Sequence, residues 1–131
     1  MGREEEVRVL LVEDDPATSE MYRLRLSADG YDVLTAADGE EGLRRAVAER
    51  PDLIYLDVRL PKLDGFEVLE RLRADTATSA IPVVMLTNYS DAEVRERGLR
   101  LGALEFLVKS DTTPAALADA VGRHSEPRIL R

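Results

Sequence analysis

Short apolar runs alternate with stretches of helical period along the whole chain. The runs at 7–12 (VRVLLV), 52–56 (DLIYL) and 81–86 (IPVVML) are too short for helices and predict strands buried on both faces. Two further strands are predicted at 31–36 and 105–108. Apolar runs that alternate with amphipathic stretches are typical of an α/β protein with a parallel sheet. We therefore predict five β-α units in a doubly wound sheet.

The stretches between the runs each show one apolar face at helical spacing. The faces expected to point inward are, in chain order, Ala17, Met21, Leu24 and Ala28; Leu43, Ala46 and Val47; Phe66, Leu69 and Leu72; Val94, Gly98 and Leu101; and Leu117, Ala120 and Val121. The first helix is expected to stop near Gly30, and the second before Pro51. Ser90 with Glu93 forms a capping-box pattern, and Thr113 is followed by a proline suited to the first helical position.

The length of 131 residues predicts a single domain, and 44% hydrophobic residues are enough for a core. We expect the domain to span residues 1–122, with residues 123–131 as a C-terminal tail or the stump of a linker. The N-terminal sequence MGREEE lacks the apolar stretch of a signal peptide, and no apolar run is long enough for a membrane span. A cytoplasmic protein without membrane contact is expected.

Composition also limits the chemistry. The chain has no cysteine and a single histidine, His124, so a metal ion would have to be bound by oxygen ligands. The formal net charge of -8 argues against direct binding to nucleic acid, which depends on basic residues that release counterions.

Chemically active residues lie where four of the five predicted strands end. They are Glu13, Asp14 and Asp15 after the first strand, Asp57 after the third, Thr87 after the fourth and Lys109 after the fifth. Any one of them also suits a helix cap or a turn. In an open parallel sheet, however, these ends share one edge, where ligands bind. Crowded carboxylates favour a cation such as Mg²⁺, and a hydroxyl with an ammonium group suits phosphoryl oxygens.

Four segments together resemble a known family. They are VLLVEDDP at 9–16, DLIYLDVRLPKLDG at 52–65, VVMLTN at 83–88 and GALEFLVKS at 102–110. They resemble the receiver domains of two-component response regulators, and the resemblance covers residues 7 to about 122. It implies a flavodoxin-like (βα)5 fold whose five-stranded parallel sheet has the order 2-1-3-4-5.

The resemblance also implies a function and a site. Asp57 would accept a phosphoryl group from the phosphohistidine of a sensor histidine kinase or a histidine phosphotransfer protein. The implied set of residues around it comprises Glu13, Asp14, Asp57 and the Arg59 backbone carbonyl for Mg²⁺ (or Mn²⁺), Thr87 and Lys109 for the phosphoryl oxygens, and Phe106 as an aromatic switch. Such a domain is a phosphoacceptor in signalling rather than an enzyme.

A signal at this site would have to reach a partner. The implied output surface is formed by the fourth helix, the fifth strand and the fifth helix, because Thr87 and Phe106 lie on that side. A downstream protein, or a second copy of the chain in a homodimer, is the expected partner.

Three positions depart from the family pattern. Ser110 replaces the usual proline after the lysine, and we predict a trans Lys109–Ser110 peptide, because a cis bond without proline costs about 2.5 to 4 kcal/mol. Asn88 is larger than the usual residue and is expected to narrow access to the site. Phe106 lacks the hydroxyl of a tyrosine.

Two expectations concern the behaviour of the site. Arg59 and Tyr89 each lie two residues beyond a strand-end residue, so both are expected to shield an acyl phosphate from water. Without a metal ion, Glu13, Asp14 and Asp57 are expected to repel one another, so that neutralising one of them should stabilise the fold.

Other functions remain open at this point. A phosphatase of the haloacid dehalogenase group would carry DxD at its nucleophile, which LDVRL lacks. A flavodoxin would need amide and hydroxyl donors where this chain has the acidic EDDPATSE. A receiver-like interaction module that is never phosphorylated is a third alternative. The GxxxxGK pattern of P-loop nucleotide hydrolases is absent.

Overall fold

The computed structural model of the chain describes residues 6–88 and 91–124. Its five parallel strands are β1 (Arg8–Val12), β2 (Asp32–Ala36), β3 (Leu53–Asp57), β4 (Val83–Thr87) and β5 (Glu105–Val108), in the order β2-β1-β3-β4-β5. The α-helices are α1 (Pro16–Ala28), α2 (Gly39–Glu49), α3 (Gly65–Ala74), α4 (Ala92–Arg100) and α5 (Pro114–His124), and a 3-10 turn, η2, covers Lys109–Asp111. The predicted five β-α units and strand order are confirmed.

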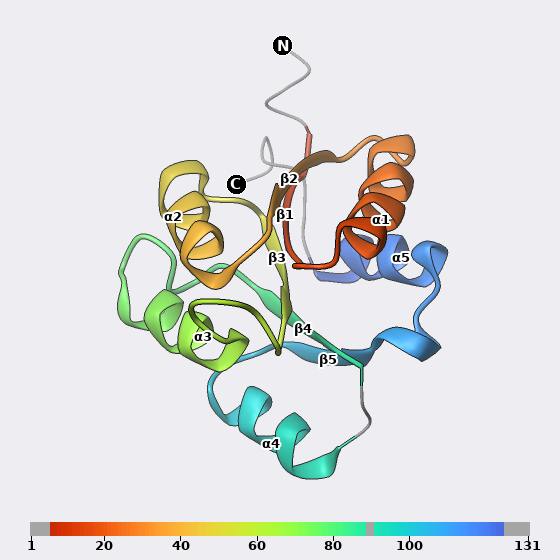
Figure 1. Ribbon diagram of the computed structural model, residues 1–131. Helices are drawn as coiled ribbons and strands as arrows, with labels where there is room; N and C mark the ends of the chain where they lie inside the picture. The colour runs from red at the N-terminus through yellow and green to blue at the C-terminus, as the bar shows by residue number, and fades with distance from the viewer. Residues whose placement is uncertain (1–5, 89–90, 125–131) are drawn as a thin grey trace.

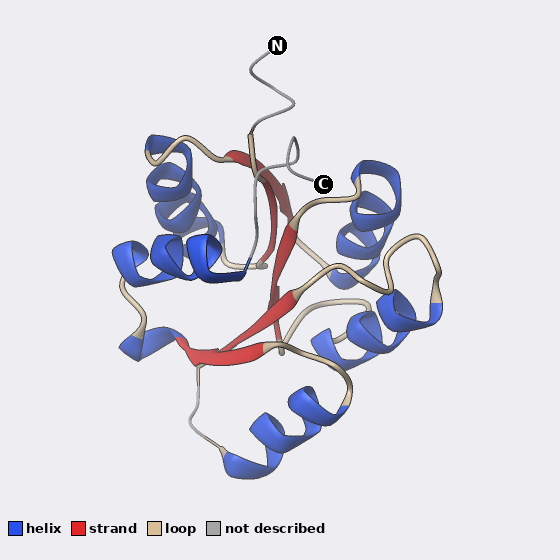
Figure 2. Cartoon of the chain, turned by 180° about the vertical axis from the view of Figure 1, so that it is seen from behind, coloured by secondary structure: helices blue, strands red, loops and turns tan. Residues whose placement is uncertain are grey.

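Helices cover both faces of the sheet (Figure 1). Helices α1 and α5 lie on one side, and α2, α3 and α4 lie on the other, as the view from behind also shows (Figure 2). Alternate residues of each strand enter the two layers, so that Val9 and Leu11 pack under α1 and α5 whereas Leu10 and Val12 pack on the opposite side. The continuous apolar runs in the sequence are explained by this burial on both faces.

Aspartates cap four of the five helices. The side chains of Asp15, Asp38, Asp64 and Asp91 accept hydrogen bonds from backbone N–H groups in the first turns of α1 to α4. In α5 the predicted cap is confirmed, because the Thr113 hydroxyl accepts from the Ala116 N–H at 3.1 Å.

The predicted cap at Ser90 is wrong, and Ser90 itself lies outside the described residues. Helix α4 begins at Ala92, and the Asp91 carboxylate accepts from the N–H groups of Glu93 and Val94. A carboxylate next to the first helical residue is a strong acceptor for two orphan donors, so the cap lies one residue later than the capping-box pattern indicates.

The predicted inward face of the first helix is also wrong. Met21 and Leu24 are 45% and 54% exposed, whereas Tyr22 and Leu26 are 1% and 0% exposed. The helix is rotated because the Tyr22 ring packs in the core with its hydroxyl donating to the Thr112 carbonyl at 3.2 Å. In α2, Val47 is likewise exposed at 39%, although Ala46 beside it is buried. The inward residues predicted for α3 and α5 are buried as expected.

The lengths of the helices test two expectations from the sequence, the domain boundary and the absence of a membrane span. Helix α5 continues to His124, two residues beyond the predicted domain boundary. None of the described helices is long and apolar enough to cross a membrane.

The rotation of α1 predicts opposite outcomes for two leucines of the same helix. Leu26→Ala should lower the free energy of unfolding by about 2 to 4 kcal/mol, because it opens a cavity in the core. Leu24→Ala should change it by less than about 0.5 kcal/mol, because this side chain is exposed. Urea unfolding of both variants measures the difference, and equal losses would mean that the helix is rotated differently.

Candidate functional site

The carboxyl ends of the strands bring the predicted site residues to one edge of the sheet. Parallel pairing sets Val12 beside Leu56 in β1 and β3, and Thr87 beside Val108 in β4 and β5. Glu13 and Lys109 are the residues that immediately follow β1 and β5, and Asp57 and Thr87 are the last residues of β3 and β4. The register therefore gathers residues that are up to 96 positions apart in the sequence.

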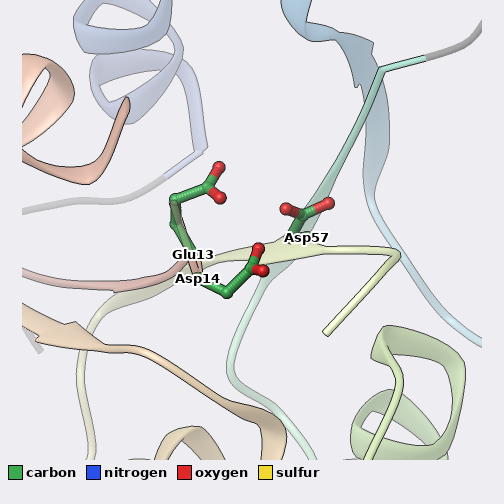
Figure 3. Close-up of side chains that lie close together, drawn as sticks. All are labelled: Glu13, Asp14 and Asp57. Atoms are coloured by element: carbon green, nitrogen blue, oxygen red, sulfur yellow. The ribbon is translucent and has the colours of Figure 1, made fainter. Parts of the chain in front are cut away.

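Three carboxylates meet at this edge (Figure 3). Glu13 and Asp14 come from the end of β1 and Asp57 from the end of β3, and one carboxylate oxygen of each lies within 4.8 Å of the others. Glu13 and Asp57 are buried, at 2% and 4% exposure, whereas Asp14 is exposed at the rim. Oxygen ligands from two buried groups and one accessible group match the donor set of a hard divalent cation.

Lys109 bridges the two buried carboxylates. Its ammonium group donates to Glu13 Oε1 at 2.5 Å and to Asp57 Oδ2 at 2.7 Å. Burial lowers the pKa of Lys109, but the hydrogen bonds to Asp57 and Glu13 outweigh this effect and raise the pKa above its ordinary value. The expected mutual repulsion of the three carboxylates is therefore offset for two of them by a cation of the chain itself.

The remaining oxygens of these carboxylates are held unequally. Glu13 Oε2 accepts from the Asp15 N–H at 2.9 Å, so both Glu13 oxygens have donors. Burial raises the pKa of Glu13 above its usual value, although the hydrogen bonds from Lys109 and Asp15 counteract part of the rise. Asp57 Oδ1 accepts a long hydrogen bond of 3.4 Å from the Arg59 N–H. The loosely held Oδ1 is the Asp57 oxygen best able to accept a new ligand.

The loop after Asp57 turns back so that Gly65 lies against the backbone of Asp57 and Val58. The Gly65 N–H donates to the Val58 carbonyl at 2.8 Å, and a Cβ on Gly65 would lie 2.2 Å from the Asp57 carbonyl oxygen. A residue without a side chain is therefore required at 65. The adjacent Asp64 forms a capping box with Glu67, which starts α3 directly beside the site.

The other predicted residues surround this cluster at different depths. Thr87 is 5% exposed, and Asn88 and Arg59 are exposed. Tyr89 lies outside the described residues. Phe106 is half-buried against α4, where a Cβ on Gly98 would lie 3.3 Å from its ring and 3.2 Å from Met85 Sδ.

The loop that carries Lys109 was only partly predicted. The Lys109–Ser110 peptide is trans, as expected. The 3-10 turn over Lys109–Asp111 and the hydrogen bond from Tyr22 to Thr112 were not anticipated. A tyrosine on the first helix at a core position was the signal that could have indicated a polar link through the core.

Comparison with known proteins identifies the family. The sequence profile of the response regulator receiver domain matches residues 9–121. The chain belongs to the response regulator receiver domain family. It is therefore a signalling domain of the two-component type, with the CheY-like flavodoxin fold.

Several relatives of this receiver domain are informative. It is 41% identical over 121 residues to the alkaline phosphatase synthesis transcriptional regulatory protein PhoP of Bacillus subtilis. This match covers 91% of this chain and 50% of PhoP. It is 46% identical over 102 residues to the DNA-binding dual master transcriptional regulator RpaA of Synechocystis. That match covers 78% of this chain and 42% of RpaA. The receiver domain thus spans about half the length of these curated relatives.

A solved structure of similar size is matched over nearly its whole length. The chemotaxis response regulator CheY4 of Vibrio cholerae matches with a TM-score of 0.84 and 35% identity, over 90% of this chain and 98% of CheY4.

The charges in the site predict opposite effects for two substitutions in the metal-free receiver domain. Lys109→Met should lower the free energy of unfolding by about 3 to 5 kcal/mol, because it leaves two buried carboxylates without their cation. Asp14→Asn should raise it by up to about 1 kcal/mol, because an exposed negative charge next to the cluster is removed. Thermal unfolding in the presence of a chelator measures both.

The loss in Lys109→Met should also depend on pH. Burial raises the pKa of Glu13 and the hydrogen bond from Lys109 lowers it, so removal of Lys109 raises this pKa further, and the cost of the Glu13 charge grows as the pH rises through it. The destabilisation should therefore be smaller at about pH 5 than at about pH 8. A loss that is independent of pH would show that Glu13 does not carry the uncompensated charge.

Proposed function

We propose that this receiver domain accepts a phosphoryl group on Asp57 from the phosphohistidine of a sensor histidine kinase or a histidine phosphotransfer protein. The observation that carries the proposal is the arrangement of Asp57, a buried carboxylate with one oxygen bound to Lys109 and one loosely held, beside Glu13 and Asp14. The family membership supports the same reaction class.

The transfer exchanges the P–N bond of the donor for a P–O bond to Asp57. An Asp57 carboxylate oxygen attacks phosphorus in line with the P–N bond of the phosphohistidine, and the P–O bond of an acyl phosphate forms as the P–N bond breaks. The electron pair of the P–N bond goes to the imidazole nitrogen of the donor. Lys109, which already touches Asp57, is close enough to transfer its hydrogen bonds to the new phosphoryl oxygens, and Thr87 at the end of β4 offers a hydroxyl.

A divalent cation fits this proposal. When bound, Mg²⁺ or Mn²⁺ would neutralise part of the negative charge on the phosphoryl oxygens. Glu13, Asp14, Asp57 and the Arg59 backbone carbonyl would hold it, and the proximity of the three carboxylates supports this ligand set. The domain acts as a phosphoacceptor in a cytoplasmic pathway and does not turn over a separate substrate.

The site assignment predicts a single labelled residue. The parent protein, incubated with acetyl phosphate and Mg²⁺, should gain one phosphoryl group at Asp57, and chelation of the metal should prevent the gain. Asp57→Asn should abolish labelling, whereas Asp119→Asn, an exposed aspartate on α5, should label as the parent does. Intact-protein mass and peptide mapping measure the result, and undiminished labelling of Asp57→Asn would contradict the proposal.

The output surface is the face formed by α4, β5 and α5. Phe106 on β5 packs against Gly98 of α4, and the Arg97 guanidinium of α4 lies 4.4 Å from the centroid of the Phe66 ring in α3. When Asp57 is phosphorylated, Thr87 gains a strong acceptor, and its movement changes the space available to Phe106. A downstream protein, or a second copy of the chain, would bind the altered face.

Amide hydrogen exchange tests this coupling. A beryllofluoride adduct with Mg²⁺, which mimics the phosphoryl group, should change exchange rates in α4 and β5, because the packing around Phe106 is altered. Amides of α2, which packs against β1 and β2, serve as the internal control. Unchanged exchange in α4 and β5 with a fully formed adduct would contradict the coupling.

Access of water should set the lifetime of the acyl phosphate. Arg59 follows Asp57 by two residues and is exposed, so we expect its side chain to cover the approach of water to Asp57. Asn88 and Tyr89 follow Thr87 and would cover the other side, although Tyr89 lies outside the described residues.

The shielding predicts faster loss of phosphate in Arg59→Ala. A block of the attacking water that raises the barrier by about 1.4 kcal/mol slows hydrolysis tenfold, so its removal should speed the loss by up to about that factor. The backbone hydrogen bond from residue 59 to Asp57 is retained in this variant. Release of phosphate in Mg²⁺ is measured for the parent, Arg59→Ala, Tyr89→Ala and the double variant, and equal rates in all four would refute shielding.

A further inference from the structure

The ammonium group of Lys109 has to be held accurately, yet its backbone lies in a surface loop. The two residues after it, Ser110 and Asp111, are exposed, whereas the Lys109 side chain is only 12% exposed and reaches between Glu13 and Asp57. The lysine side chain has four rotatable bonds, so its nitrogen keeps a single position only where contacts restrain both the side chain and the backbone at 108–112. The restraint on this backbone therefore has to come from hydrogen bonds to buried residues.

Thr112 closes the loop around the lysine. Its N–H donates to the Lys109 carbonyl at 3.1 Å, and its hydroxyl donates to the Val108 carbonyl at 2.7 Å. These two hydrogen bonds bracket the lysine, because they hold the carbonyl groups on both sides of the Lys109 α-carbon. Thr112 is 8% exposed, so water competes weakly for them.

Tyr22 ties this loop to the first helix. Its hydroxyl donates to the Thr112 carbonyl at 3.2 Å, across 90 residues of sequence, and its ring is 1% exposed. Burial raises the pKa of Tyr22, so the hydroxyl is a neutral donor. Thr112 therefore has its N–H, its hydroxyl and its carbonyl all engaged in hydrogen bonds that fix the loop.

Helix α1 begins next to the carboxylates that Lys109 binds. The Asp15 N–H donates to Glu13 Oε2, and the Asp15 side chain caps the same helix. One rigid helix thus holds the partner of the lysine at its first turn and the loop of the lysine through Tyr22. Helix α1 is therefore in contact with Glu13 through Asp15 and with the loop of Lys109 through Tyr22.

We infer that Tyr22 is a positioning residue for Lys109, which acts through the hydrogen bonds of Thr112. The inference rests on the proposed function, in which the Lys109 ammonium group contacts the transferred phosphoryl group. Loss of the Tyr22 hydroxyl, with the ring retained, loosens the loop and lets the ammonium group leave its position between Glu13 and Asp57.

The experiment compares two tyrosines that are equally buried. Tyr22→Phe removes the donor to Thr112. Tyr55→Phe is the matched control, because Tyr55 is 0% exposed and its hydroxyl donates to another backbone carbonyl, that of Leu117 in α5. Thr112→Val removes the bond to Val108, and Thr112→Ser retains a hydroxyl for the same bond.

The first measurement is made on metal-free protein and does not depend on phosphorylation. Lys62 and Lys109 are the two lysines of the chain, so the ammonium groups of a protein labelled with ¹⁵N-lysine give a spectrum of two signals. Hydrogen exchange with water is measured at each signal, with Lys62 as the exposed reference. The second measurement is the rate of labelling by acetyl phosphate with Mg²⁺.

The expected result is selective. Tyr22→Phe and Thr112→Val should speed exchange at the Lys109 ammonium severalfold and slow labelling by about tenfold, as expected for a charged group that is no longer held in place. Tyr55→Phe and Thr112→Ser should stay close to the parent in both measurements. Parent-like ammonium exchange in Tyr22→Phe, or an equal change in Tyr55→Phe, would overturn the inference. If the parent is not labelled at Asp57, the proposed function fails, and the ammonium exchange still decides whether Tyr22 positions Lys109.

Discussion

The carboxyl edge of the sheet depends on the contact between one ammonium group and two buried carboxylates. Lys109 binds Glu13 and Asp57 at the same time and so joins the ends of β1, β3 and β5. Two carboxylates at 2% and 4% exposure would be costly without a cation, because both would lose most of their hydration. The parallel sheet makes the contact possible, since it brings three strand ends to one edge.

The surrounding residues keep that edge in place through backbone contacts. Gly65 allows the loop after β3 to touch the Asp57 carbonyl, and Asp64 starts α3 at the same point. On the other side, Tyr22 and Thr112 hold the loop after β5. The backbone around the charged groups is thus held by hydrogen bonds and close contacts. A buried ion pair with fixed geometry can favour one arrangement of the loops, although burying its charges costs free energy.

The same arrangement links charge to packing. In the proposed reaction Lys109 and Thr87 respond to a new phosphoryl group at Asp57, and Phe106 lies on the adjacent strand against Gly98 of α4. A Cβ built on Gly98 would lie 3.3 Å from the Phe106 ring, so α4 and Phe106 are in close contact. A local change of charge would therefore reach the surface as a change in the position of a helix.

The sequence alone determined the strands and the residues at the carboxyl edge of the sheet, and its resemblance to receiver domains implied the strand order. Continuous apolar runs indicate strands buried on both faces, and strand ends of a parallel sheet meet whatever the details of packing. Only the tertiary structure decided that α1 buries Tyr22 and Leu26 rather than Met21 and Leu24, and that Lys109 binds Glu13 and Asp57 together. Periodicity restricts the apolar positions of a helix but not its rotation about its axis, which depends on partners such as the Thr112 carbonyl, 90 residues away in sequence.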